Sequence, residues 1–220
     1  MKKLTFPLAL LFFHLLLSCK SDKRISREVF EQVQRSQEVK KINKVDILNK
    51  ALEWGEEISL EAQKELMGTL QKAISERGVS GAVEFCNIEA LPILKQVSDE
   101  YGVSIRRASN AYRNPADQPN ETEKAILEAY EYNQENGIEG NAPNVQKLEN
   151  GKELLFTKAI TIPGGLCLNC HGEPGVNIEK ETLEIIDRLY PEDKAKGHQI
   201  GSLRGMWSIS IPIKEVVNKM

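Results

Sequence analysis

The chain has 220 residues, of which 40% are hydrophobic and 28% are charged, a balance typical of a soluble folded domain and not of a membrane-embedded or disordered chain. Its formal net charge is −3, with 29 basic residues scattered among 32 acidic ones. Nucleic-acid-binding proteins concentrate positive charge on one surface, so this composition excludes that class and we expect no nucleic-acid partner.

The N-terminal residues have the pattern of a bacterial lipoprotein leader. Lys2 and Lys3 precede an almost unbroken apolar run, residues 4–17, which is shorter than the roughly 20 residues that a membrane-spanning helix needs. Residues 16–19 read Leu-Leu-Ser-Cys, which resembles the motif at which such leaders are cleaved and the cysteine is acylated.

We therefore predict a lipoprotein signal peptide over residues 1–18 and a membrane-lipid partner bound through acylated Cys19. This places the protein in the bacterial cell envelope, lipid-anchored on the periplasmic or surface side. The alternatives are an ordinary secretory peptide or an uncleaved anchor, in which Cys19 is incidental.

The chain after the leader divides into a spacer and a body. Residues 19–54 are highly charged, with apolar residues at helical spacing, and are expected to form a lipid-anchored helical spacer. The body, residues 55–220, begins with apolar periodicity that predicts helices over 58–74 and 82–101, separated at Gly78 and with Pro92 as a candidate kink.

In the second half of the body, strand and turn patterns appear among the helical ones. A polar loop over residues 110–120 precedes a helix over 121–136. Residues 145–148 and 154–162 flank Asn150–Gly151, a pair typical of a tight β-hairpin turn. A short helix over 180–190 and an alternating strand over 202–213 follow. Helices first and strands later predict an α+β fold, with an antiparallel sheet, flanking helices and an N-terminal helical segment.

One motif carries chemistry. Residues 167–171 read Cys-Leu-Asn-Cys-His, the attachment sequence of c-type haem. Two thiols at this spacing can form thioethers to the two vinyl groups of one porphyrin, and the adjacent histidine is then held at the iron. We therefore predict one covalent haem c, bound by Cys167 and Cys170, with His171 as an axial iron ligand. The alternatives are a disulfide between the two cysteines, or a Cys₃His zinc site completed by Cys86 with His171 or His198.

The residues alone leave the second axial ligand open. His198, Cys86, Met67, Met206 and Met220 are the candidates outside the leader. Cys86 lies on the apolar face of its helix, where a free buried cysteine is common, and Met206 alternates inward on a strand.

From about Leu66 to Ile213 the chain resembles the Tll-like family of PAS-like c-type haem sensors, typified by a cyanobacterial protein. The matching segments are residues 81–87 (Gly-Ala-Val-Glu-Phe-Cys-Asn), 105–110 (Ile-Arg-Arg-Ala-Ser-Asn), 113–115 (Arg-Asn-Pro), 167–172, 190–195 (Tyr-Pro-Glu-Asp-Lys-Ala) and 201–211. The resemblance implies a PAS-like antiparallel sheet with flanking helices. It also implies that Cys86 is the distal iron ligand, opposite His171.

A thiolate ligand favours ferric iron and would lower the reduction potential. Arg106 and Arg107 are candidates to pair with the haem propionates, and a solvated strand end is the alternative for both. Members of this family often precede a membrane span and a signalling module, whereas this sequence stops at Met220.

The expected function is an envelope-anchored, mono-haem redox or small-ligand sensor with a redox or signalling protein partner. The alternatives are an electron-transfer or accessory cytochrome without a signalling role, and the zinc domain. Because an iron with six ligands leaves no open position for a substrate, we expect no enzymatic activity.

Overall fold

The computed structural model describes residues 26–36, 43–138 and 141–220. The chain divides into two units, residues 1–41 and 42–220. The described part of the first unit contains α1 (Arg27–Ser36), and the leader with Cys19 lies outside the described residues. Among the helices that the structure describes, none combines the length and the hydropathy of a membrane span.

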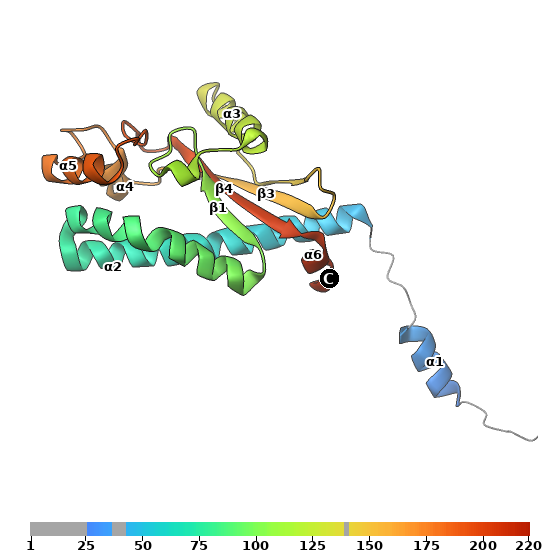
Figure 1. Cartoon of the computed structure of the whole chain (residues 1–220). Helices are drawn as coiled ribbons and strands as arrows, with labels where there is room; N and C mark the ends of the chain where they lie inside the picture. The colour runs from blue at the N-terminus through green and yellow to red at the C-terminus, as the bar shows by residue number, and fades with distance from the viewer. Residues whose placement is uncertain (1–25, 37–42, 139–140) are drawn as a thin grey trace, which may run out of the picture. The chain divides into compact units, whose positions relative to one another are not determined.

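The second unit begins with α2 (Lys44–Tyr101), which is a helical hairpin (Figure 1). Its arms, residues 44–77 and 79–101, meet at Gly78, whose φ of 72° lies in the left-handed region that glycine adopts readily. The separation at Gly78 is therefore confirmed. Pro92 does not interrupt the second arm, since Gly78 is the residue of this helix with non-helical backbone angles. The expected boundary between residues 54 and 55 falls inside the first arm, where Ala51 and Trp54 are buried in the core.

A four-stranded antiparallel sheet packs on this hairpin. Its strands are β1 (Ser104–Ala108), β2 (Asn144–Lys147), β3 (Glu153–Thr161) and β4 (Leu203–Pro212), in the spatial order β1-β4-β3-β2. The predicted hairpin is β2 and β3, with Gly151 at a φ of 68° in its turn. The predicted α+β class, with an antiparallel sheet, is confirmed.

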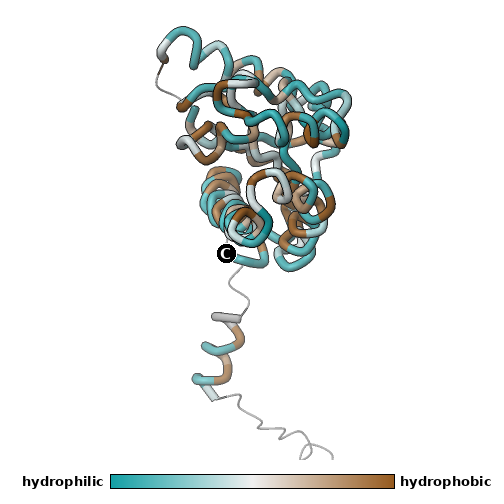
Figure 2. The backbone as a smooth tube through the Cα atoms, turned by 90° about the vertical axis from the view of Figure 1, so that its left-hand side faces the viewer, coloured by the Kyte–Doolittle hydropathy of each residue, from teal (hydrophilic) through white to brown (hydrophobic). Residues whose placement is uncertain are grey.

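The sheet has helices on both faces (Figure 1). One face packs on α2 and forms the main core, whose members include Trp54, Ile58, Phe156, Ile209 and Ile211. The other face carries α3 (Glu121–Glu135), which packs through Leu127 on Met206. Side chains alternate between these faces along each strand, and Figure 2 shows the corresponding mixture of hydrophobic and hydrophilic residues along the elements of this unit.

Four short elements complete the unit. They are the 3₁₀ turn η1 (Pro115–Asp117), α4 (Gly165–His171), α5 (Lys180–Leu189) and α6 (Ile213–Asn218). In Figure 1, α4 and α5 lie near the bend of α2, whereas α6 lies at the opposite end of the sheet. Thr182 of α5 hydrogen-bonds Ser80 at 3.0 Å, and Ile186 packs on Val83, so α5 is fastened to the second arm of α2.

The contact between α2 and the sheet predicts a large effect for one small substitution. A Cβ atom added at Gly55 would overlap the ring of Phe156, which is fully buried. We expect Gly55→Ala to lower the free energy of unfolding by about 1–3 kcal/mol, as overpacking does. Gly68→Ala is the matched control, because nothing lies within 4 Å of its added Cβ on the same helix. This control should stabilise the chain by about 0.5–1 kcal/mol through helix propensity. Urea unfolding measures both, and equal effects at the two sites would contradict the packing.

Candidate functional site

The Cys-x-x-Cys-His segment forms the short helix α4. A helix places Cys167 and Cys170 one turn apart on the same side, and both thiols are free and half-buried. The helix begins after Gly164, and added Cβ atoms at Gly164 and Gly165 would meet nothing within 4 Å. The two thiols therefore lie next to each other, and the space beside Gly164 and Gly165 is open.

His171 ends α4 with its ring in a defined orientation. Its Nδ1 lies 2.9 Å from the carbonyl oxygen of Ala195. Because a carbonyl only accepts hydrogen bonds, Nδ1 carries the proton and Nε2 keeps its lone pair, which is the form that binds a metal. Burial, with the positive charges of Arg204 and Arg113, holds the pKa of His171 well below its usual 6.5. The imidazole is therefore neutral at physiological pH.

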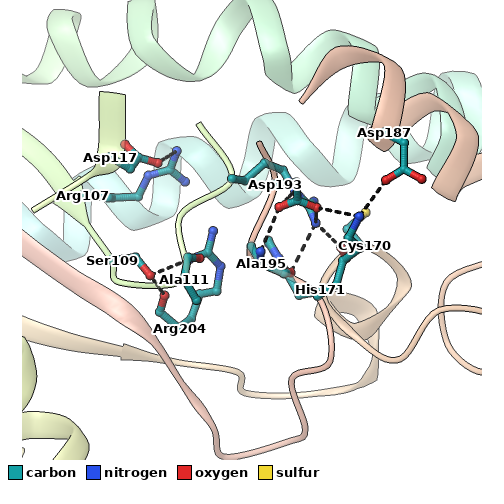
Figure 3. Close-up of polar contacts among 12 residues, drawn as sticks. Arg107, Ser109, Ala111, Asp117, Cys170, His171, Asp187, Asp193, Ala195 and Arg204 are labelled. Carbon is teal, nitrogen blue, oxygen red and sulfur yellow. Dashed lines mark hydrogen bonds and ion pairs between the residues drawn. The ribbon is translucent and has the colours of Figure 1, made fainter. Parts of the chain in front are cut away.

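Arg113 fastens the loop that supplies this carbonyl. Its Nε and Nη2 each donate to Asp193 at 3.2 Å, and Nη2 also donates to the carbonyl oxygens of Cys170 and Ala195. A second connection runs from the backbone N–H of His198 to the carbonyl of His171 at 2.9 Å. The loop over residues 193–198 is thereby tied to α4 at several points, and Figure 3 shows Asp193 and Ala195 beside His171 and Cys170.

Cys86 comes from the second arm of α2 and joins the same cluster. Its thiol interacts electrostatically with that of Cys170, which packs on the group formed by Val83, Ile178 and Ile186. Burial raises the pKa of Cys86, and the positive charges of Arg107 and Arg113 act against this shift. The structure therefore brings together four of the predicted site residues, Cys86, Cys167, Cys170 and His171, although Cys86 is far from the others in sequence.

The two candidate arginines do not lie together. Alternation along β1 puts Arg107 on the face that packs on α2, where it lies 3.6 Å from Asp117. Arg106 points to the opposite face, where it pairs at 2.6 Å with the buried Glu123 of α3 and donates to the carbonyls of Ala116 and Gln118. Arg107 is thus near the cysteine cluster, whereas Arg106 belongs to the α3 side of the sheet.

Two residues of the site were missed by the sequence analysis. Arg113 lies in the Arg-Asn-Pro segment, which carried only the resemblance. Arg204 lies in the segment 201–211, which likewise carried only the resemblance, and its orientation depends on an irregularity of β4. The register with β3 passes from Gly205 to Leu203, so Arg204 is the extra residue of a β-bulge. From there it donates to Ser109 Oγ at 3.0 Å and to the Ala111 carbonyl at 2.9 Å (Figure 3).

The structure disfavours the two alternatives for the cysteines. Cys86, Cys167 and Cys170 are all free, so no disulfide joins the motif cysteines. In the described part of the chain, no three His, Cys, Asp or Glu side chains are placed to hold one metal ion, so a Cys₃His zinc site is not assembled. Of the other ligand candidates, Met206 is buried against α3, and His198 lies with its ring edge-on to His171, at 6.2 Å between ring centroids.

The residues that are present fit a covalently attached porphyrin. Two adjacent free thiols could form the thioethers, and a neutral imidazole with a free Nε2 and a third thiol nearby could bind the iron. A cavity of about 340 Å³ lies between the second arm of α2 and β1 and is lined by Leu91, Arg106, Arg107 and Asp117 among others, but by none of the site cysteines or His171. The guanidinium groups of Arg107, Arg113 and Arg204 act electrostatically on Cys86 or His171, and such positive charges suit an anionic ligand.

The fold and the site define an α+β domain, with one antiparallel sheet, that carries a Cys-x-x-Cys-His segment beside a helical hairpin. The profile of the Tll0287-like family matches residues 20–212, and the chain therefore belongs to this family. Its fold is similar to the crystal structure of the cyanobacterial heme-protein Tll0287, with a TM-score of 0.53 and 22% identity, over 73% of this chain and 94% of that one. No curated protein matches the chain significantly.

The buried pair of Arg113 and Asp193 yields a prediction about the stability of the site. The two side chains are 11% and 1% exposed, so removal of the cation leaves an uncompensated buried carboxylate. We expect Arg113→Gln to lower the free energy of unfolding by about 3–5 kcal/mol, as for other broken buried pairs. The control is Arg188→Gln, which removes an exposed pair with Glu84 and should cost about 0–1 kcal/mol. Denaturant unfolding measures both variants, and a small loss for Arg113→Gln would show that Asp193 needs no partner.

Proposed function

We propose that this chain is a mono-haem c-type cytochrome domain that acts as a redox or small-ligand sensor. Cys167 and Cys170 hold the haem through thioethers, His171 Nε2 is the proximal iron ligand and Cys86 Sγ is the distal one. The observation that carries the proposal is the hydrogen bond from His171 Nδ1 to the Ala195 carbonyl, which leaves Nε2 free beside two motif thiols. When bound, the haem iron supplies one-electron redox chemistry.

The proximal and distal residues are held in different ways. His171 is fixed by Ala195, and its backbone carbonyl is bonded to His198 N, so its position depends on two segments of the chain. Cys86 is held by its own helix, and burial raises the pKa of its thiol. This thiol loses its proton only when a strong positive charge lies next to the sulfur. Ferric iron carries more positive charge than ferrous iron, so it would stabilise the thiolate more strongly. With haem bound, electron uptake would therefore favour proton uptake at Cys86 Sγ.

This coupling favours a sensor over an electron carrier. A carrier works best with the same ligands in both oxidation states, whereas a ligand that leaves converts a redox change into a structural change. Cys86 lies on the arm of α2 to which α5 is fastened through Ser80–Thr182 and Val83–Ile186, so its movement would affect both helices. We propose a redox or signalling protein as the partner of the domain, and no enzymatic activity.

The proposal is tested first by covalent attachment of haem to the chain and then by the identity of the iron ligands. The full chain, expressed with its leader and haem-attachment machinery, should gain the mass of one haem and keep it through denaturation. Its ferric spectrum should be low-spin with thiolate features in spin resonance, and its ferrous form should admit carbon monoxide. Absence of covalent haem would refute the proposal.

Cys86→Ala is the decisive variant. It should keep the covalent haem, because Cys167 and Cys170 are intact, yet give a high-spin or water-ligated ferric form and a raised reduction potential. Cys86→Met is the matched control, since it retains a sulfur ligand without a thiolate and should raise the potential while the iron keeps its sixth ligand. An unchanged ferric spectrum in Cys86→Ala would transfer the distal role to another residue and favour the electron-carrier function.

We propose that the domain is anchored in the bacterial cell envelope by acylation of Cys19, on the periplasmic or surface side. The support is the sequence of residues 16–19 after a short apolar run. Cys19→Ala should abolish labelling by a fatty-acid analogue and block cleavage of the leader, whereas Cys86→Ala should leave labelling and cleavage unchanged. Labelling that persists in Cys19→Ala would contradict this anchor.

A further inference from the structure

Buried nitrogen atoms without hydrogen-bond partners are concentrated at one place in the molecule. Six buried side-chain nitrogen or oxygen atoms lack a partner in the described part of the chain, and three of them are Arg107 Nε, Arg204 Nε and His198 Nε2. Such atoms are rare in folded proteins, because each loses its hydration without compensation. Arg204 and His198 act electrostatically on His171, whose ring lies edge-on to that of His198, and Arg107 acts electrostatically on Cys86.

Arg204 has the clearest deficit of negative charge. Its hydrogen bonds go to the neutral acceptors Ser109 Oγ and Ala111 O, and it makes no ion pair with any described residue. Burial, together with the charges of Arg107 and Arg113, lowers its pKa from 12.5 to about 10. A buried guanidinium without an anion is strongly unfavourable, so the position of Arg204 requires another reason.

The nearby carboxylates are already engaged. Asp193 accepts two of the four hydrogen bonds of Arg113 and lies 3.7 Å from Lys196. Asp117 lies 3.6 Å from Arg107. Neither carboxylate makes an ion pair with Arg204 within the described residues, although both act on it electrostatically. The cluster therefore has an excess of positive charge on the side of the sheet that carries the cysteines.

We propose that Arg204, together with Arg107 and His198, binds the carboxylate groups of the porphyrin. This inference rests on the proposed haem function and specifies which residues hold the anionic edge of the ring. Each residue comes from a different segment: Arg204 from the bulge of β4, Arg107 from the neighbouring β1, and His198 from the loop bonded to His171. The two arginine Nε–H groups need acceptors, and His198 Nε2 donates as well when it carries the ring proton; a propionate supplies two acceptor oxygens and one negative charge.

Arg106 is excluded from this role by its own contacts. Its guanidinium pairs with Glu123, whose carboxylate is 2% exposed and also accepts from Ser208 Oγ at 2.7 Å. It lies on the α3 face of the sheet, away from Cys86. The expectation that Arg106 and Arg107 act as a propionate pair is therefore replaced by the pair Arg107 and Arg204.

The test compares two arginine-to-methionine variants of the haem-loaded full chain. Arg204→Met should retain covalent haem, because both motif cysteines are intact, but should shift the propionate bending bands in resonance Raman spectra. It should also lower the reduction potential, since the unneutralised carboxylate favours the ferric iron. Arg106→Met is the matched control. It should lower the unfolding midpoint through loss of the Glu123 pair, yet leave the propionate bands and the potential as in the wild type.

The outcomes separate this inference from the function on which it rests. Wild-type chain without covalent haem would refute the haem function itself. Attached haem with unchanged propionate bands in Arg204→Met would overturn the present inference and leave the haem function intact. If Arg204→Met does not fold, Arg204→Lys replaces it: this variant keeps the charge but has no Nε donor. It should shift the bands at nearly wild-type potential, and unchanged bands would again overturn the inference.

Discussion

The carbonyl oxygen of Ala195 is the acceptor on which the site depends. It receives the Nδ1–H of His171 at 2.9 Å and an Nη2–H of Arg113 at 3.3 Å. The first bond sets the tautomer of the imidazole, and the second fixes the carbonyl itself, because Arg113 is anchored in turn by Asp193. Without this carbonyl, Nδ1 and Nε2 would compete for the proton and the ring would be free to rotate. The reactivity of Nε2 is thus decided 24 residues further along the chain.

The helical hairpin α2 provides the packing surface that the short helix α4 does not have by itself. A seven-residue helix such as α4 has little buried surface of its own, and its residues are half-exposed. The second arm of α2 gives it a wall, since Val83 packs with Ile178, Ile186 and Cys170 into one cluster. The same arm carries Cys86 one turn beyond Val83, so the packing that stabilises the motif also positions the third thiol. Gly78 makes this possible, because its left-handed angle reverses the chain between the two arms.

Much of this arrangement follows from local sequence signals, and the rest depends on tertiary structure. Asn150–Gly151 and Gly78 predicted their turns because their backbone conformations suit few other residues, and the spacing of the motif predicted adjacent thiols. Alternation along β1 would have been sufficient to separate Arg106 from Arg107, although both are propionate candidates on sequence alone, since neighbouring strand residues face opposite sides. Arg204 was beyond prediction, because regular alternation would put it on the face of Met206, and only the bulge at Arg204 turns it toward Ser109. The ion pair of Arg113 and Asp193 joins residues 80 apart, and no local pattern encodes it.

In the proposed function the two sides of the site act on the iron in opposite directions. A thiolate from Cys86 would donate charge and favour the ferric state, whereas the guanidinium groups of Arg107, Arg113 and Arg204 would oppose additional positive charge and favour reduction. When porphyrin carboxylates neutralise Arg204 and Arg107, these arginines disfavour the ferric state less. The reduction potential would therefore depend on the carboxylate contacts as well as on the axial ligands. His171 is not free to move. Its ring is hydrogen-bonded to the Ala195 carbonyl, which Arg113 also contacts, and its own carbonyl accepts from the backbone N–H of His198. Cys86 has no comparable set of bonds, and its raised pKa favours the protonated thiol. In the proposed function, a change in the charge of the iron would therefore act on Cys86 and through it on α2, whereas His171 would keep its position.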